Sequence, residues 1–192
     1  MKQQEVFSSA RWVGAPKDGF FILRGRFTLE NAKKATLRVI GLGYYHCYIN
    51  GKRVSNDFFL PLSTDYEERK NYPVDEIISG HRIYVPEYDI TDTLKNGENI
   101  IAIHFGGGWY DCDPKAGYGD AKAIWRVFGE DENGEFDFVS SEKDKISASF
   151  VKEYNFTDCE VQDFTCVNTD LLFGSFDDSL PCGLRWSEGR KA

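Results

Sequence analysis

The sequence predicts an all-β protein, most simply a two-sheet β-sandwich of the jelly-roll type. Hydrophobic and polar residues alternate along several short segments, which is the pattern of half-buried strands. No segment shows the 3.6-residue periodicity of an amphipathic helix of ordinary length. Aromatic residues, which are enriched in strands, make up 15% of the chain. Many short strands separated by turns favour a sandwich, with a barrel as the alternative.

The alternation is clearest over residues 21–29. There the odd positions Phe21, Leu23, Phe27 and Leu29 share one face and polar residues such as Arg24 occupy the other. The same reasoning predicts half-buried strands over residues 35–39, 101–105, 124–128, 136–139 and 146–151.

Two hairpin turns and one short helical turn are expected between strands. Asn50-Gly51 and Asn133-Gly134 tolerate the positive φ that tight hairpin turns require. Residues 90–97 can form one helical turn, with Thr91 or Asp92 as the N-cap and Gly97 as its stop.

Two regions interrupt the regular succession of strands. Residues 67–82 predict an inserted surface loop. Residues 106–120 contain five glycines together with aromatic and acidic side chains, a composition typical of a functional loop. Gly106-Gly107-Gly108 predicts no phosphate loop, because no Gly-Lys-Ser/Thr and no helix pattern follow it.

Composition limits the classes of protein that need to be considered. The 192 residues suit one sizeable domain, or one domain with a short appendage. The net charge of −8 argues against a nucleic-acid partner. No apolar run approaches the ~20 residues of a membrane span, and no signal-peptide core is found, so a cytoplasmic location is expected. The five cysteines are odd in number and lack Cys-x-x-Cys spacing, which favours reduced thiols.

The 106–120 loop contains the first candidate binding residues. Trp109 and Tyr110 would stack on a sugar while Asp111 accepts hydrogen bonds from its hydroxyls. Alternatively, Trp109 plugs the end of the sandwich. Asp111 and Asp113 are also weak candidates for calcium, against the more frequent interpretation of a charged, solvated loop. His46, His81 and His104 lack metal-ligand spacing, so we assign them no catalytic role.

Three ordered segments, residues 41–66, 88–99 and 105–110, resemble the N-terminal β-sandwich domain of bacterial α-L-rhamnosidases. The similarity extends over roughly residues 9–178, which implies a β-sandwich accessory module at 9–178 and a linker toward an absent catalytic domain at 179–192. It implies a galactose-binding-domain-like fold and a non-catalytic accessory module, because the family's catalytic acids lie in a separate helical (α/α) barrel. Some modules of this kind bind rhamnose, with calcium helping in certain members, and others only brace the catalytic domain.

The resemblance also implies site residues and partners. Asn56-Asp57 matches an acidic pair of the family and Thr64-Asp65-Tyr66 matches a later element, so Asn56, Asp57, Asp65 and Tyr66 join the expected sugar-binding set. The expected partners are a rhamnose-containing glycan and the catalytic domain of the same parent chain, with no cofactor apart from calcium. The chain departs from the family at Pro61-Leu62-Ser63 and at Ser175, where the family usually has a glutamate.

Overall fold

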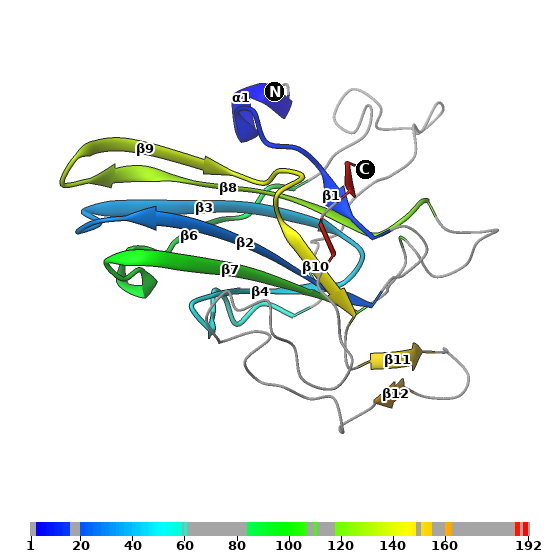
Figure 1. Ribbon diagram of the computed structural model, residues 1–192. Helices are drawn as coiled ribbons and strands as arrows, with labels where there is room; N and C mark the ends of the chain where they lie inside the picture. The colour runs from blue at the N-terminus through cyan, green and yellow to red at the C-terminus, as the bar shows by residue number, and fades with distance from the viewer. Residues whose placement is uncertain are drawn as a thin grey trace, which may run out of the picture.

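A computed structural model describes residues 3–15, 20–58, 60, 84–106, 110, 118–148, 151–154, 160–162, 187–188 and 190–191, with backbone alone from residue 148 onward. It confirms the all-β prediction: two antiparallel six-stranded sheets pack face to face (Figure 1). None of the helices in these ranges is long and apolar enough to cross a membrane.

The first sheet, sheet A, has the order β14-β1-β8-β3-β6, with β9 also paired to β8. Its strands are β1 (Val13–Gly14), β3 (Lys34–Leu42), β6 (Glu87–Asp89), β8 (Lys122–Asp131), β9 (Gly134–Val139) and β14 (Arg190–Lys191).

The second sheet, sheet B, has the order β13-β10-β2-β7-β4-β5. It contains β2 (Phe21–Leu29), β4 (Tyr45–Ile49), β5 (Lys52–Arg53), β7 (Gly97–Phe105), β10 (Lys145–Ala148) and β13 (Ser187–Glu188). A separate pair is formed by β11 (Val151–Tyr154) and β12 (Glu160–Gln162). No strand of the described ranges belongs to both large sheets, so the fold is a sandwich and not a barrel.

The predicted strands are present, and β2 has the predicted bounds. The segment expected as one strand over 146–151 instead contributes to two, β10 and β11. Residues 187–188 and 190–191 fall in the stretch expected as a linker, and their backbone pairs with β10 and β1 respectively. The domain boundaries themselves stay a prediction.

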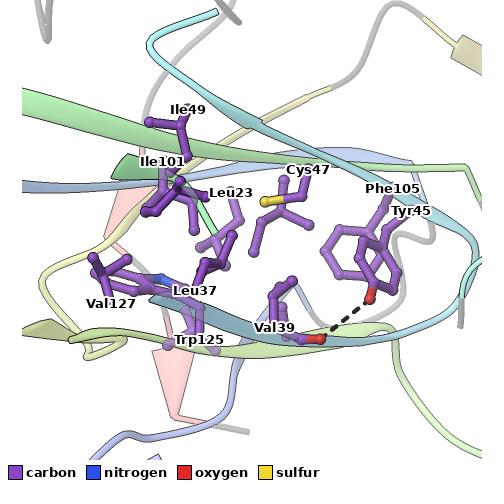
Figure 2. Close-up of a cluster of buried hydrophobic side chains, with 14 of the residues drawn as sticks. Leu23, Leu37, Val39, Tyr45, Cys47, Ile49, Ile101, Phe105, Trp125 and Val127 are labelled. Atoms are coloured by element: carbon purple, nitrogen blue, oxygen red, sulfur yellow. Dashed lines mark hydrogen bonds between the residues drawn. The ribbon is translucent and has the colours of Figure 1, made fainter. Parts of the chain in front are cut away.

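The interior between the sheets is filled by the predicted apolar faces. Phe21 stacks on Phe105 with ring centroids 4.4 Å apart. Trp125 is 1% exposed and lies against Gly25, where an added Cβ would come within 2.4 Å of the indole ring. Figure 2 shows the Tyr45 hydroxyl in this part of the core, where it donates to the Val39 carbonyl over 3.3 Å. The core therefore satisfies its buried tyrosine from within.

One expectation about burial was met only in part. On the polar face of β2, Arg26 and Thr28 are exposed, as a half-buried strand requires, but Arg24 is 2% exposed and Ile22 on the same face is 0% exposed. Burial lowers the pKa of Arg24, and the charge of Glu98 opposes that effect. Alternation identifies which residues share a face, but it cannot reveal how deeply each of them is buried.

The Asn50-Gly51 turn is confirmed. It joins β4 to β5 with φ of +48° and +79° at its two residues. The second hairpin differs in detail: Glu132 and Asn133 form the loop, while Gly134 pairs with Asp131 at a φ of +123°. The Asp131 carboxylate accepts the backbone N–H of Asn133 over 2.7 Å, so a side chain shapes this turn.

The helical turn is a 3₁₀-helix, η1 (Thr91–Thr93). The predicted caps were wrong, because the Asp89 carboxylate accepts the backbone N–H of Thr91 over 3.0 Å and its hydroxyl over 2.6 Å. These hydrogen bonds favour the ionised carboxylate and lower the pKa of Asp89. Gly97 begins β7 at a φ of +85° and does not end the helix.

A buried amide cluster, formed by Asn50 and Asn99, closes this end of the sandwich. Asn99 is 0% exposed and accepts from the Asn50 side chain over 2.7 Å and from the Lys95 N–H over 2.9 Å. It donates to the carbonyls of Lys95 and Gly97. All four hydrogen-bonding positions of the Asn99 amide are therefore used.

A short helix, α1 (Gln3–Phe7), lies outside sheet A (Figure 1). Val6 and Phe7 of this helix form a second hydrophobic cluster with Ile40 and Ile124 on the outer face of the sheet. The N-terminal segment thus covers part of that face.

Candidate functional site

The site begins at the loop that follows the β4–β5 hairpin, residues 54–58, which we call the 54–58 loop. Two of the predicted sugar-binding residues, Asn56 and Asp57, lie there and are exposed. The next residue, Phe58, is 68% exposed, although a large apolar ring normally prefers burial. An aromatic ring is thus presented to solvent beside an amide and a carboxylate.

Hydrogen bonds hold the backbone of this loop in place. The Asp57 N–H donates to the Ser55 hydroxyl over 2.8 Å, and the Arg53 guanidinium donates to the Asp57 carbonyl over 2.5 Å. The same guanidinium lies 5.0 Å from the centroid of the Phe58 ring, a cation–π distance. Arg53 therefore fixes both the carboxylate-bearing residue and the exposed ring.

Strand β6 of the opposite sheet also contacts the loop. The Tyr88 hydroxyl donates to the Asp57 carboxylate over 3.2 Å. Burial, together with the negative charge of Asp57, raises the pKa of Tyr88 to about 12. Tyr88 consequently stays protonated at neutral pH and keeps donating to Asp57. A carboxylate oriented in this way is suited to accept hydroxyl groups of a ligand.

A small hollow of about 10 Å³ lies beneath the loop, with Asp57, Tyr88, His46 and Leu60 among its lining residues. It has room for a single water molecule. A ligand would therefore lie on top of the loop rather than within it.

The two described histidines lie opposite each other, His46 on β4 and His104 on β7. Burial and the neighbouring Arg53 lower the pKa of His46, and burial together with His46 lowers the pKa of His104 to about 4. Both imidazoles are neutral at pH 7. Among the described residues, no three histidine, cysteine or acidic side chains are grouped as metal ligands.

The 106–120 loop is described only in part. Trp109, Asp111 and Asp113 lie outside the described residues, as do Asp65 and Tyr66 and the 67–82 segment. Tyr110, expected at a loop rim, is instead 9% exposed and packs in the second hydrophobic cluster, with its ring 6.1 Å from that of Tyr118. The structure thus brings Asn56 and Asp57 together and places Tyr110 elsewhere. A role for Tyr110 in sugar binding stays a prediction.

Sequence reasoning missed Phe58, Arg53 and Tyr88. Phe58 had a signal, since an apolar aromatic residue directly after a polar turn is unusual. Arg53 and Tyr88 had none, because their roles depend on contacts between β5, β6 and the loop. Cys47 is a free thiol in the core, where burial raises its pKa, in line with the expectation of reduced cysteines for this one residue.

Known proteins resemble this chain in sequence. The family model described as the alpha-L-rhamnosidase N-terminal domain matches residues 30–181. An alpha-L-rhamnosidase of Streptomyces avermitilis is 33% identical over 90 residues, which cover 46% of this chain and 8% of that relative.

Solved structures resemble it in fold. The alpha-L-rhamnosidase from Dictyoglumus thermophilum superposes with a TM-score of 0.77 at 23% identity, over 96% of this chain and 21% of that chain. The Streptomyces avermitilis alpha-L-rhamnosidase, solved in complex with L-rhamnose, has a TM-score of 0.72 at 23% identity, over 91% and 16% of the two chains. The present chain thus spans a small part of these relatives.

Proposed function

The chain belongs to the family of alpha-L-rhamnosidase N-terminal domains, and from this premise we propose that it is a non-catalytic module that binds carbohydrate at the 54–58 loop. The observation that carries the proposal is the exposed Phe58 ring beside the exposed Asn56 and Asp57. Flat aromatic rings offer the apolar surface on which the C–H face of a sugar stacks, and the neighbouring carboxylate and amide pair with its hydroxyls.

Preorganisation supports the proposal. Arg53 and Tyr88 hold Asp57 and Phe58 before any ligand arrives, so little freedom is lost on binding. We propose L-rhamnose as the sugar, since the Streptomyces avermitilis relative was solved with that ligand. The parent chain would supply the catalytic domain, and the module would keep a rhamnose-containing glycan near it. The remaining predicted residues, Trp109, Tyr110, Asp111, Asp65 and Tyr66, belong to the hypothesis as untested contacts.

Calcium is a proposed helper and not a required cofactor. Asn56 and Asp57 supply the oxygen ligands that calcium prefers, and Asp111 and Asp113 are the next candidates. Titrations with and without calcium decide this point.

Calorimetric titration of the 192-residue chain with L-rhamnose tests the proposal. A dissociation constant around 1 mM, equivalent to ~4 kcal/mol, is within reach of one stacked ring and a few hydrogen bonds. Phe58→Ala and Asp57→Asn should each weaken binding about tenfold with an unchanged melting temperature. Tyr84→Ala removes another exposed aromatic ring, 51% exposed, and serves as the matched control.

Two results would contradict this assignment. Binding that survives Phe58→Ala but is lost in Tyr118→Ala would move the site to the 106–120 loop. Absence of binding to any rhamnose-containing glycan would leave the alternative that the module only braces a catalytic domain.

A further inference from the structure

A second hollow lies away from the 54–58 loop, on the outer face of sheet A. It is an open groove of about 570 Å³ across β3, β8 and β9, which we call the sheet groove. Its side chains include Lys34, Thr36, Arg126, Phe128, Glu135 and Asp137. None of its lining residues lines the hollow beneath the 54–58 loop.

An aromatic ring and two guanidinium groups form the base of this region. The Phe128 ring is half-buried, and the guanidinium carbons of Arg38 and Arg126 lie 4.8 Å and 4.6 Å from its centroid. Flat groups packed in this way give an extended surface that is apolar in the middle and donates hydrogen bonds at its edge.

Both arginines are held in place by several partners. Asp137 binds Arg126 through two contacts, Nε to Oδ1 over 2.7 Å and Nη2 to Oδ2 over 3.1 Å. Glu87 binds Arg38 over 2.5 Å. Each arginine also donates from Nη1 to the Val6 carbonyl of α1, over 2.9 Å from Arg38 and 3.2 Å from Arg126. The surface is therefore preorganised.

Polar groups in the groove remain available to a ligand. The side chains of Thr36 and Glu135 make no hydrogen bond or ion pair with any residue in the described part of the chain. The Asp137 carboxylate keeps lone pairs beyond the two used by Arg126. A hydroxyl, an ammonium group and carboxylates thus face the same open space.

The balance of charge narrows the chemical class of the ligand. Two cations in the lining, Lys34 and Arg126, face three carboxylates, those of Glu130, Glu135 and Asp137. A phosphate, a sulfate or a nucleic acid would meet these carboxylates at short range. A neutral molecule with many hydroxyls would donate to the carboxylates and accept from the cations, while its C–H face meets the aromatic ring.

We propose that the sheet groove is a second carbohydrate-binding surface, which takes a neutral oligosaccharide across β3, β8 and β9. Three adjacent strands span ~10 Å, which is longer than a single sugar ring and suits a chain of sugars. This surface is separate from the 54–58 loop, and the inference rests only on the residues that line the groove. A module with both surfaces holds a polymer at two points, so its affinity for polymer exceeds its affinity for a single sugar.

The test is an NMR titration of the ¹⁵N-labelled 192-residue chain. The probes are rutinose, maltohexaose, cellohexaose and xylohexaose as neutral sugars, and a galacturonic acid hexamer as the acidic counterpart. At least one neutral sugar should shift the amide signals of Thr36, Phe128 and Glu135. Signals of residues 54–58 report separately on the loop, so failure of one site is distinguishable from failure of the other.

Variants make the result specific. Thr36→Val and Glu135→Gln each remove one ligand-facing group without breaking an internal hydrogen bond, and each should weaken binding about fivefold. Glu142→Gln is the matched control, since Glu142 is exposed outside the groove and its one ion pair within the described residues is with Arg11 over 3.5 Å. Absence of groove shifts with every neutral sugar would overturn the inference. Unchanged binding in the Thr36→Val/Glu135→Gln double variant, or tighter binding of the acidic hexamer, would overturn it equally.

Discussion

The β4–β5 hairpin connects two polar regions that use similar side chains in opposite ways. Asn50 lies in the turn of this hairpin and belongs to the buried amide cluster with Asn99, where each amide group is paired with another part of the protein. Asn56 and Asp57, a few residues later, lie exposed in the 54–58 loop. The Asp57 carboxylate has one side-chain partner in the described residues, Tyr88.

The difference separates a stabilising role from a binding role. Buried amides must be paired, because an unpaired buried group costs about 1–3 kcal/mol, and the buried Asn99 amide accordingly has no capacity left for a ligand. The exposed loop is held by Arg53 and Tyr88 but keeps hydrogen-bonding capacity toward solvent. Substitutions in the cluster should therefore change stability, and substitutions in the loop should change binding.

The largest effect is expected for Asn99→Ala. This change removes two donors and two acceptors from a fully buried site and leaves the Lys95 and Gly97 groups unpaired. We expect a loss of about 3–4 kcal/mol in the free energy of unfolding, measured by urea denaturation. Asn96→Ala, which breaks an exposed amide pair with Asn31, is the control and should cost less than ~1 kcal/mol. Equal effects of the two changes would refute the distinction between buried and exposed amides.

The buried carboxyl group of Asp144 provides a second test of the comparison between buried and exposed polar groups. It accepts the Trp125 indole N–H over 2.8 Å, and burial raises its pKa to about 7. The folded state thus binds this proton more tightly than the unfolded state, whose pKa is near the ordinary 3.8. The contribution to stability is fully present below about pH 4 and is lost as the pH rises to 7, by up to about 4 kcal/mol.

Asp144→Asn keeps an acceptor for Trp125 and removes the titration. The difference in unfolding free energy between this variant and the wild type, measured by urea denaturation from pH 4 to pH 8, should grow in favour of the variant as the pH rises. A difference that is constant across this range would show that Asp144 is ionised in the folded protein at all of these pH values.

A smaller effect is expected at the turn that links the two regions. Gly51 has a φ of +79°, so Gly51→Ala should cost about 1 kcal/mol in urea denaturation. Gly51 lies before the 54–58 loop and is not part of it, so L-rhamnose binding should be unchanged when the variant is folded. Weakened binding at unchanged stability would indicate that the turn positions the loop.

The smallest change in stability is expected for Tyr88→Phe. The variant loses the hydroxyl that donates to Asp57 but keeps the half-buried ring, so the free energy of unfolding should change by less than ~1 kcal/mol. L-rhamnose should bind a few-fold more weakly by calorimetry. Full binding in this variant would mean that Asp57 orients itself without help.

Sequence reasoning recovered what depends on local pattern. The alternation over residues 21–29 predicted β2, and Asn50-Gly51 predicted the turn between β4 and β5. Both predictions depend on backbone rules that act within a few residues. Sequence reasoning misassigned the cap of η1, since Thr91, Asp92 and Asp89 are all plausible caps and only the folded chain shows that Asp89 accepts the hydrogen bonds.

The candidate site was recovered only in part. Asn56 and Asp57 were predicted from a family resemblance. The contact of Phe58 with Arg53, and the hydrogen bond of Asp57 with Tyr88 on the other sheet, could not be predicted. The burial of Tyr110 is likewise a tertiary effect, since it depends on α1 crossing the outer face of sheet A. Contacts between segments far apart in sequence carry no local signal.

The pairing of β3 with β8 also governs how the chain reaches this fold. Lys34 pairs with Glu130 and Leu42 with Lys122, so the central ladder of sheet A joins residues 80 or more positions apart (122 − 42 = 80). The β2–β7 ladder is similarly remote, from Leu29 with Gly97 to Ile22 with His104. Closing such long loops must precede most of the energetic gain, which places folding in the millisecond-to-second range of proteins with high contact order. The local hairpins at Asn50-Gly51 and at Asn133 can form within microseconds, so we expect the search for register between β3 and β8 to limit the rate of folding.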